Sequence, residues 1–376
     1  MRRTVLARLF ALSLLVTSLL GAGAQGHRVL RLTFMGDIMA HDVNYRMKDF
    51  RDIYRGVEPI VSQSDLTVAN LELPVDPTRP ESGYPFFNGN LAYVRAAVDA
   101  GVNVFSLANN HAFDGGEEGV FQTLRSLRAL GVASTRPLFF SGIRGNPQRP
   151  FIPETILVRG VRVGFIAATQ FLNEQDAGGH VNMVDYCDEA AADAFLQYVK
   201  DASPLFDLFI VSYHGDQEYA REPSVLKRAF FHRLLESGAH IVFSHHPHIA
   251  QGYEVVRVGG AGRLIMYSMG NFISAMTWRL DPENPDETAA ATGEAYLLSV
   301  EVRCAAGGCS VAGVVPFPIA NYRNTRGEMV AARLSDLAGG AVKLPRAWQA
   351  FYAQRLDRML RFLGRFDTGG GPGGDQ

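Results

Sequence analysis

The sequence has little cysteine and no excess of charge of either sign. Of its 376 residues only three are cysteine, and 36 lysine and arginine residues face 38 acidic ones, for a formal net charge of −2. A chain without a basic excess lacks the electrostatic footprint of a nucleic-acid-binding protein, so we expect no nucleic-acid partner. No cysteine has the spacing of a zinc–thiolate site, so a metal here needs nitrogen and oxygen ligands.

Long apolar runs are missing beyond residue 25. The one apolar run, Leu6–Leu20, follows Arg2 and Arg3, and the small residues Ala22-Gly23-Ala24 come directly after it. This order predicts a cleaved signal peptide over residues 1–24, and therefore an exported protein that is periplasmic, extracellular or on the cell surface. A membrane anchor is the alternative, but the run is short for the ~20 residues that a spanning helix needs.

Two of the cysteines stand close together. Cys304 and Cys309 lie between predicted strands at 296–303 and 310–317, which form a hairpin. A disulfide across this turn is expected in an oxidising compartment, and two free thiols are the alternative. Cys187 is left as an unpaired thiol, either buried or idle.

Apolar strands alternate with amphipathic helices along the chain, with no repeat and no domain linker. Such alternation predicts an α/β fold, with helices layered on a buried sheet. Strands are expected at 29–35, 66–71, 102–107, 161–168, 205–213, 240–243 and 264–267, and helices at 50–62, 91–100, 117–130, 189–200 and 224–237.

The last third of the chain is less regular. Residues 280–292 are rich in Asp, Glu, Pro and Ala and predict a long loop. Residues 344–366 form a basic amphipathic helix, which we expect to pack on the domain rather than on a membrane surface. We interpret the arginines of 144–149 and 355–365 as solvated rather than as polyanion-binding patches. The glycine-rich tail, 368–376, is expected to be disordered.

Six polar motifs follow predicted strands. They are Gly36-Asp37, Asn70-Leu71-Glu72, Asn109–Asp114, Tyr213–Glu218, Ser244–His248 and Tyr267–Phe272. Each alone has an ordinary explanation, such as a turn, a strand cap or a hydrogen-bonded histidine. Together they predict one site, because α/β sheets form their sites beyond the carboxyl ends of the strands. Mixed carboxylate, amide and imidazole ligands suit divalent Mn, Fe or Zn.

The order of these motifs resembles the CapA/poly-γ-glutamate capsule-synthesis family, whose fold is similar to that of calcineurin-like metallophosphoesterases. The resemblance covers residues 29 to about 275 and implies a layered β-sandwich flanked by helices and a role in capsule or poly-γ-glutamate biosynthesis. We expect this domain to extend over residues 29–320, with a C-terminal helical extension over 335–366. The matching stretches are GDIM (Gly36–Met39), DLTVANLELP (Asp65–Pro74), GVNVFSLANNHAFDGGEEGVFQTL (Gly101–Leu124), VRVGFIA (Val161–Ala167), VSYHGDQEY (Val211–Tyr219), GAHIVFSHHPHIAQGYE (Gly238–Glu254) and LIMYSMGNFI (Leu264–Ile273).

The resemblance also implies a site that holds two divalent metal ions. Glu72 would bridge them, His111 would donate a proton, and Asp114 would hold the His111 ring, with His245 in a supporting position. The implied metal ligands are Asp37, Glu72, Asn110, His214, His246 and His248.

Two departures from the phosphoesterase pattern bear on function. Met39 stands where phosphoesterases have a histidine, with His41 two residues further on, and the bridging position carries Glu72 instead of aspartate. One hypothesis is a metal-dependent hydrolase or transferase that acts on a phosphoester or an anionic polymer, with cell-envelope capsule machinery as a partner. The other is a non-catalytic polymer-binding or export factor that binds carboxylates at the same site. A nucleotide site at Gly259–Gly262 is a weaker hypothesis, because these glycines fit a hairpin turn.

Overall fold

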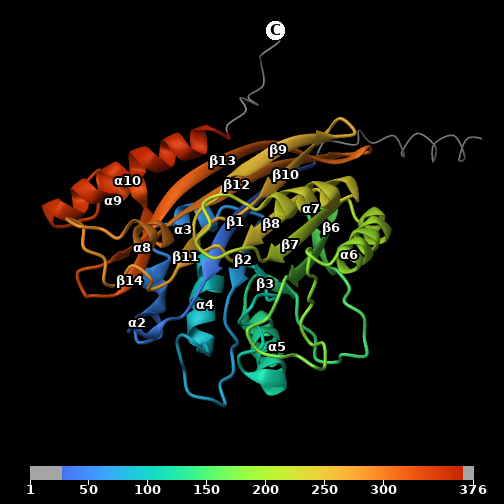
Figure 1. Ribbon diagram of the computed structural model, residues 1–376, viewed down its shortest axis with the longest axis horizontal. Helices are drawn as coiled ribbons and strands as arrows, with labels where there is room; N and C mark the ends of the chain where they lie inside the picture. The colour runs from blue at the N-terminus through green and yellow to red at the C-terminus, as the bar shows by residue number, and fades with distance from the viewer. Residues whose placement is uncertain (1–27, 367–376) are drawn as a thin grey trace, which may run out of the picture.

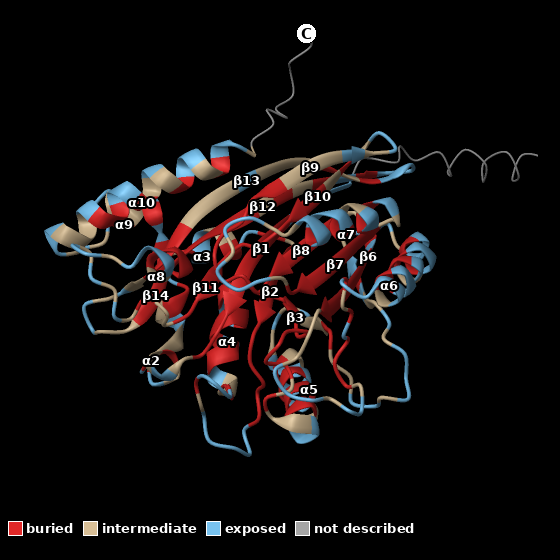
Figure 2. Cartoon of the chain, in the orientation of Figure 1, coloured by how far each residue is buried: buried red, intermediate tan, exposed pale blue. Residues whose placement is uncertain are grey.

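The computed structural model describes residues 28–366, so the predicted signal peptide and the glycine-rich tail lie outside the described residues. Two β-sheets pack face to face, and helices cover their outer faces (Figure 1). This is the predicted α/β class, a layered β-sandwich flanked by helices. Most strands of both sheets are buried where they cross the centre of the molecule (Figure 2).

The first sheet has the order β14-β13-β12-β1-β2-β3-β4, and β11 pairs with β1 outside this path. Strands β1 to β4 run parallel to one another, so their carboxyl ends lie at one edge. The bounds are β1 (Arg28–Ile38), β2 (Leu66–Leu71), β3 (Val104–Ser106), β4 (Phe139–Ser141), β11 (Asn271–Ile273), β12 (Glu294–Ala305), β13 (Gly308–Arg323) and β14 (Met329–Arg333).

The second sheet has the order β5-β6-β7-β8-β10-β9. Its four central strands are parallel, and an antiparallel strand closes each edge. The bounds are β5 (Glu154–Val158), β6 (Val161–Thr169), β7 (Leu208–His214), β8 (Ile241–His245), β9 (Tyr253–Val258) and β10 (Ala261–Met266).

Alternating side chains build the core between the sheets. On β1, Leu32 and Phe34 face the second sheet, and the Phe34 ring lies 5.4 Å from that of Phe243 on β8. On β6, Phe165 faces the same core while Ile166 points to the helices on the other side. Both faces of β6 are buried over most of its length, which explains its nearly continuous apolar sequence.

Three helices cover the outer faces as predicted. Helix α4 (Leu91–Ala100) packs on the first sheet, and α6 (Glu189–Ala202) and α7 (Val225–Glu236) pack on the second. Each begins after a polar residue whose side chain accepts a backbone N–H of the first turn, which satisfies a group that the helix leaves unpaired. These N-cap residues are Asn90, Asp188 and Ser224. Helix α5 (Gly116–Ala133) also matches its prediction within a few residues.

The helix expected over residues 50–62 is wrong. The structure has a 3₁₀ turn η1 (Phe50–Ile53) and a short α3 (Glu58–Val61), with the four-residue α2 (Asp42–Tyr45) before them. Between the two turns Gly56 bridges to Ala332 of β14, and a Cβ at Gly56 would meet the Ala331 carbonyl oxygen at 2.8 Å. The close contact with β14 breaks the helix.

The loop expected over residues 280–292 is wrong in its second half, where α8 (Glu287–Thr292) forms. The Asp286 side chain accepts the backbone N–H of Ala289 at 2.7 Å and starts this helix.

The C-terminal helix packs on the sandwich. Helices α9 (Leu334–Ala338) and α10 (Arg346–Gly364) lie along β13 and contact it (Figure 1). The side chains of Phe351, Met359 and Leu363 belong to the central core. Arg355 is only 4% exposed, so the interpretation of this arginine as solvated is wrong: its helix face lies on α8 and β12. Among residues 28–366 no helix is both long and apolar enough to cross a membrane.

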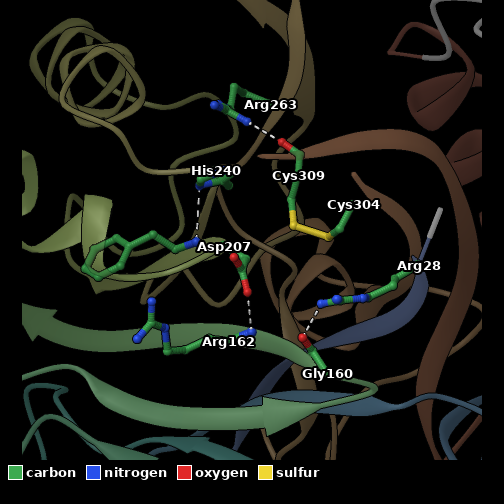
Figure 3. Close-up of a disulfide and its surroundings, with 9 residues drawn as sticks. Arg28, Gly160, Arg162, Asp207, His240, Arg263, Cys304 and Cys309 are labelled. Carbon is green, nitrogen blue, oxygen red and sulfur yellow. Dashed lines mark hydrogen bonds between the residues drawn. A yellow bond between two sulfur atoms is a disulfide. The ribbon is translucent and has the colours of Figure 1, made fainter. Parts of the chain in front are cut away.

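Cys304 and Cys309 form the predicted disulfide at the β12–β13 turn (Figure 3). Beside it, the Arg263 guanidinium of β10 donates to the Cys309 carbonyl oxygen at 2.9 Å. The Gly262 amide donates to Ser310 Oγ at 2.8 Å. The disulfide therefore lies where the two sheets meet. Cys187 is an exposed free thiol.

Candidate metal centre

The polar motifs meet at the carboxyl ends of β1, β2, β7 and β8. Asp37 on β1 pairs in register with Asn70 on β2, and His214 on β7 pairs with His245 on β8. All four side chains are fully buried. Parallel pairing within each sheet, together with packing of the sheets on each other, gathers residues that are far apart in sequence.

One amide holds both carboxylates of the cluster. Asn70 Nδ2 donates to Asp37 Oδ1 at 2.8 Å and to Glu72 Oε2 at 3.1 Å. Glu72 Oε1 has no hydrogen-bond partner among the described residues, although it is buried. It lies 3.7 Å from both His214 Nε2 and His248 Nε2. A buried carboxylate oxygen without a donor is costly, and two facing imidazole nitrogens point to a cation as the missing partner.

Two overlapping groups of donors have the composition of metal sites. Asp37, Glu72 and His248 form one group and Glu72, His214 and His246 the other, and within each group the ligand atoms lie within 4.8 Å of one another. Glu72 belongs to both groups, as a bridging ligand must. Asn110 Oδ1 lies 2.7 Å from His214 Nε2, so all six predicted ligand residues are in the cluster. Nitrogen and oxygen donors in this mixture fit a divalent ion.

The turn after β8 is held in an uncommon backbone conformation. His246 has φ 104° and His248 has φ 58°, on either side of Pro247. A left-handed conformation costs a non-glycine residue roughly 1–3 kcal/mol and is found at functional sites more often than elsewhere. The turn keeps both rings in the cluster, with their centroids 5.7 Å apart.

His111 and Asp114 form a pair beside the donor groups. His111 Nδ1 lies 2.8 Å from Asp114 Oδ2, which also accepts the Phe87 amide at 2.7 Å. Phe87 packs edge-on against the His111 ring, with centroids 4.6 Å apart. Because the Asp114 carboxylate accepts a hydrogen bond from Nδ1–H, Nε2 is the nitrogen left to exchange a proton with a ligand. Asn173 Nδ2 lies 3.4 Å from that nitrogen.

Burial and neighbouring charge shift the pKa values of the cluster in opposite directions. Burial and the nearby Asp37 raise the pKa of Glu72 well above its usual value. Burial is the largest single influence on Asp37 and raises its pKa, but the hydrogen bond and charge of His248, with smaller effects of His245 and Asn70, together outweigh burial and lower the pKa. Burial disfavours the charged form of His248, yet Glu72 and Asp37 raise its pKa to about 9. A cation bound here would replace the protons that Glu72 and His248 hold.

The remaining cluster histidines favour the neutral form that a metal ligand needs. Burial and the neighbouring His246 lower the pKa of His214 well below its usual value, and burial with His248 does the same for His246. Burial lowers the pKa of His245 to about 3.

His41 does not join the donor groups. Its Nδ1 accepts the Ala275 amide at 3.4 Å, and burial lowers its pKa to about 4. Met39, at the position of the phosphoesterase histidine, lies in the core beneath the first sheet, where its carbonyl accepts the Tyr93 hydroxyl at 2.7 Å. Neither position 39 nor His41 therefore supplies an imidazole to the donor groups of the described residues.

Three residues have closer contacts with the site than the sequence suggested. His245 Nδ1 lies 2.6 Å from His214 Nδ1, and His245 also falls within a third donor group with Asp37 and His214. Asn271 Oδ1 lies 2.9 Å from His248 Nδ1, and exposed Glu218 forms a fourth group with His246 and His248. Asn271 and Glu218 both stand in motifs that follow strands, and this position is the one sequence signal that could have found them.

The comparison with known families decides what this chain is related to. Residues 31–276 match the family described as bacterial capsule synthesis protein PGA_cap, which is more than half of the chain. The chain belongs to this family. It is 26% identical over 269 residues to the capsule biosynthesis protein CapA of Bacillus anthracis, covering 66% of this chain and 61% of that protein. The PGA biosynthesis protein CapA of Bacillus subtilis is 26% identical over 261 residues, covering 66% of this chain and 64% of that protein. The PGA_cap chain described here thus spans a little over three fifths of these relatives.

Solved structures resemble the chain only weakly. A novel phosphatase from Mycoplasma pneumoniae aligns with a TM-score of 0.46 and 14% identity, covering 78% of this chain and 95% of that one. The calcineurin-like phosphoesterase YfkN from Bacillus subtilis aligns with a TM-score of 0.41 and 13% identity, covering 90% and 99%. Similarity this low carries no information about the activity of the PGA_cap chain.

Proposed function

We propose that this PGA_cap protein is an exported factor of capsule or poly-γ-glutamate biosynthesis, with a di-metal hydrolase site that acts on a phosphoester or an anionic polymer. The observation that carries the proposal is Glu72 Oε1, a buried carboxylate oxygen that has no hydrogen-bond partner within residues 28–366 and faces His214 and His248 at 3.7 Å each. The names of the CapA relatives support the biosynthetic role.

The ligand sets follow from the two donor groups. Asp37, Glu72 and His248 would hold one ion. Glu72 and Asn110, with His214 and His246, would hold the other. This donor set suits Mn, Fe or Zn. When bound, divalent ions lower the pKa of a water molecule and polarise the oxygens of the bond to be broken.

His111 is the proposed proton donor. Asp114 accepts its Nδ1–H, and Phe87 fixes the ring from the side. Nε2 can then carry a proton to the leaving oxygen of the substrate, a role worth ~10²–10⁴-fold in rate. His111 and Asp114 are buried, so their geometry does not depend on a mobile surface side chain.

The second candidate is a non-catalytic factor that binds or exports an anionic polymer through the same cluster. The observation that favours it is Met39 at the position of the phosphoesterase histidine, with His41 outside every donor group found among the described residues. A site with fewer ligands can still bind polymer carboxylates through an ion without hydrolysing anything. Capsule machinery of the cell envelope is the proposed partner under either candidate.

Elemental analysis of the purified protein, followed by an assay with the generic phosphodiester bis(4-nitrophenyl) phosphate in Mn, Fe or Zn, separates the candidates. The hydrolase proposal expects about two ions per chain and turnover that His111→Ala abolishes. Bound metal without turnover favours the polymer-binding factor. A chain that binds no divalent ion contradicts both.

A further inference from the structure

A cavity of about 240 Å³ lies beside the metal centre, under α10. Its walls come from α10, from the end of α8 and the start of β12, and from the two loops that follow β7 and β8. Ile249 in its wall directly follows the cluster residue His248, and Arg221 lies three residues after Glu218. A molecule at the metal centre and one in the cavity would therefore contact the same two loops.

Arginine side chains surround the cavity. Arg221, Arg358 and Arg365 all line it. Arg358 is paired with Glu287 at 2.6 Å. In the part of the chain that the structure describes, Arg221 donates only to a backbone oxygen at 3.3 Å, and Arg365 lies 3.7 Å from its nearest carboxylate, on Glu222. Two guanidinium groups thus have donors to spare.

Two acidic residues near the cavity, Glu287 and Glu294, are neutralised by an arginine that does not line it. Arg355 is buried and pairs with both Glu287 and Glu294 through Nε and one terminal nitrogen. Its other terminal nitrogen is buried without a hydrogen-bond partner among the described residues. Four arginines here face three glutamates, the third being Glu222, so positive charge is in excess.

We propose that this cavity is a carboxylate subsite, which holds one acidic residue of an anionic chain while another part of that chain reaches the metal centre. The inference rests on the proposed function and names the substrate class as a polycarboxylate. The cavity is smaller than the ~300–1,000 Å³ that holds a drug-sized ligand, so it fits one residue of a polymer. Guanidinium groups bind planar carboxylates through two parallel hydrogen bonds.

The apolar walls fit the same ligand. Ile249, Met359 and Phe362 line the cavity between the arginines. A glutamyl residue has a methylene stem that such side chains can cover, and a carboxylate that Arg221 and Arg365 can bind. Charge and apolar surface together favour an acidic residue with an aliphatic stem over a bare inorganic anion.

The test uses the full protein and γ-linked tetraglutamate as the probe, with binding measured by isothermal titration calorimetry. Arg221→Gln and Arg365→Gln should each weaken binding about tenfold or more, since each removes a charge-assisted hydrogen bond. Glu222→Gln should strengthen it, because it removes the carboxylate nearest to Arg365. The matched control is Arg361→Gln on the same helix, which removes one exposed arginine paired with Asp357 outside the cavity and should change nothing.

Equal weakening by Arg361→Gln and Arg365→Gln would overturn the subsite, because binding would then depend on overall charge. Displacement of the probe by inorganic phosphate from the wild-type cavity would overturn the carboxylate assignment. Thermal unfolding checks that each variant is folded. If the variants on α10 are destabilised, Arg221→Gln still tests the subsite, because Arg221 lies on an exposed loop. Metal content and phosphodiester turnover should be unchanged in the control Arg361→Gln, which lies outside the cavity. A wild-type protein without bound metal or phosphodiester turnover would count against the proposed function. The comparison of tetraglutamate binding between the wild type and the variants would still test the subsite.

Discussion

Glu72 is the residue on which the candidate metal centre depends most. It is the one carboxylate shared by the two overlapping donor groups, and Asn70 fixes one of its oxygens while the other faces the histidines. Its raised pKa shows that the folded chain holds a negative charge there only at a cost, mainly because the carboxyl is buried beside Asp37.

Replacing Glu72 should therefore lower metal content more than any other single change. Glu72→Gln keeps the shape but removes the charge and one ligand oxygen, so we expect the loss of most bound metal by elemental analysis. Glu218→Gln is the control, because that side chain is exposed and belongs to a single donor group. A smaller loss from Glu72→Gln than from Glu218→Gln would show that Glu72 does not bridge.

Substitution of His111 should affect catalysis without affecting metal binding. His111→Ala removes the proposed proton donor but none of the six proposed ligands, so metal content should stay the same while hydrolysis of a phosphodiester falls ~10²-fold or more. Asp114→Asn should give a smaller loss, since the ring remains but its orientation is less fixed. Equal metal loss from His111→Ala and Glu72→Gln would mean that the two roles are assigned wrongly.

Metal affinity should rise with pH. Without an ion, Glu72 has a raised pKa and His248 a pKa of about 9, so this buried pair holds a proton that must leave before both residues can act as ligands. Affinity should therefore increase as pH rises toward about 9 and level off above it. Competition with a fluorescent chelator across this pH range measures the effect, and an affinity independent of pH would contradict it.

At the scale of elements, strands and helices could be predicted from the sequence where they are long and where their buried apolar residues recur with a clear period. The strand at 66–71 and the helix at 91–100 match the structure residue for residue. Strands β4 and β11 were missed because they have three residues each, and β5 because its burial is only partial. Such edge segments acquire their conformation from neighbours far away in sequence.

Some features of the candidate site could likewise be predicted from the sequence, and others could not. Residues such as Asp37 and His214 could be placed at one edge, because they end parallel strands. The double hydrogen bond of Asn70 and the contact of Asn271 with His248 could not, because they depend on side-chain orientation across two sheets. The neutralisation of Glu287 and Glu294 by Arg355 depends on how α10 docks, which no local pattern encodes.

The break in the expected helix at Gly56 can be tested through stability. Gly56→Ala places a Cβ 2.8 Å from the Ala331 carbonyl oxygen, so β14 or the turn must shift. Overpacking of this kind typically costs ~1–3 kcal/mol of unfolding free energy, measurable by urea denaturation. Gly313→Ala, on β13 with no atom within 4 Å of the added Cβ, is the matched control and should change stability little.

At the scale of the whole molecule, the two sheets meet at opposite ends through different chemistry. The candidate metal centre lies at the carboxyl ends of the parallel strands, and the Cys304–Cys309 disulfide lies at the turn between β12 and β13, next to Arg263 of the second sheet. A disulfide fits the proposed export to an oxidising compartment.

The disulfide should contribute little to overall stability. It closes a sequence separation of five residues, so it restricts few conformations of the unfolded chain, and we expect no more than ~2 kcal/mol. Comparing urea unfolding of the oxidised protein with that of Cys304→Ser/Cys309→Ser measures this. A loss well above that figure would mean that the bond also fixes the contact between the sheets.

The amide of Asn70 has a consequence for the net charge of the whole site. It holds two carboxylates in place without adding a third negative charge, and Asn110 likewise offers a neutral oxygen to the cluster. Asp37 and Glu72 would then face two divalent ions, and the exposed Glu218 of a further donor group would add at most one more negative charge. A surplus of about one to two positive charges would remain in a buried pocket. An anion would neutralise that surplus, so the two asparagines would favour negatively charged ligands before any ligand is recognised by shape.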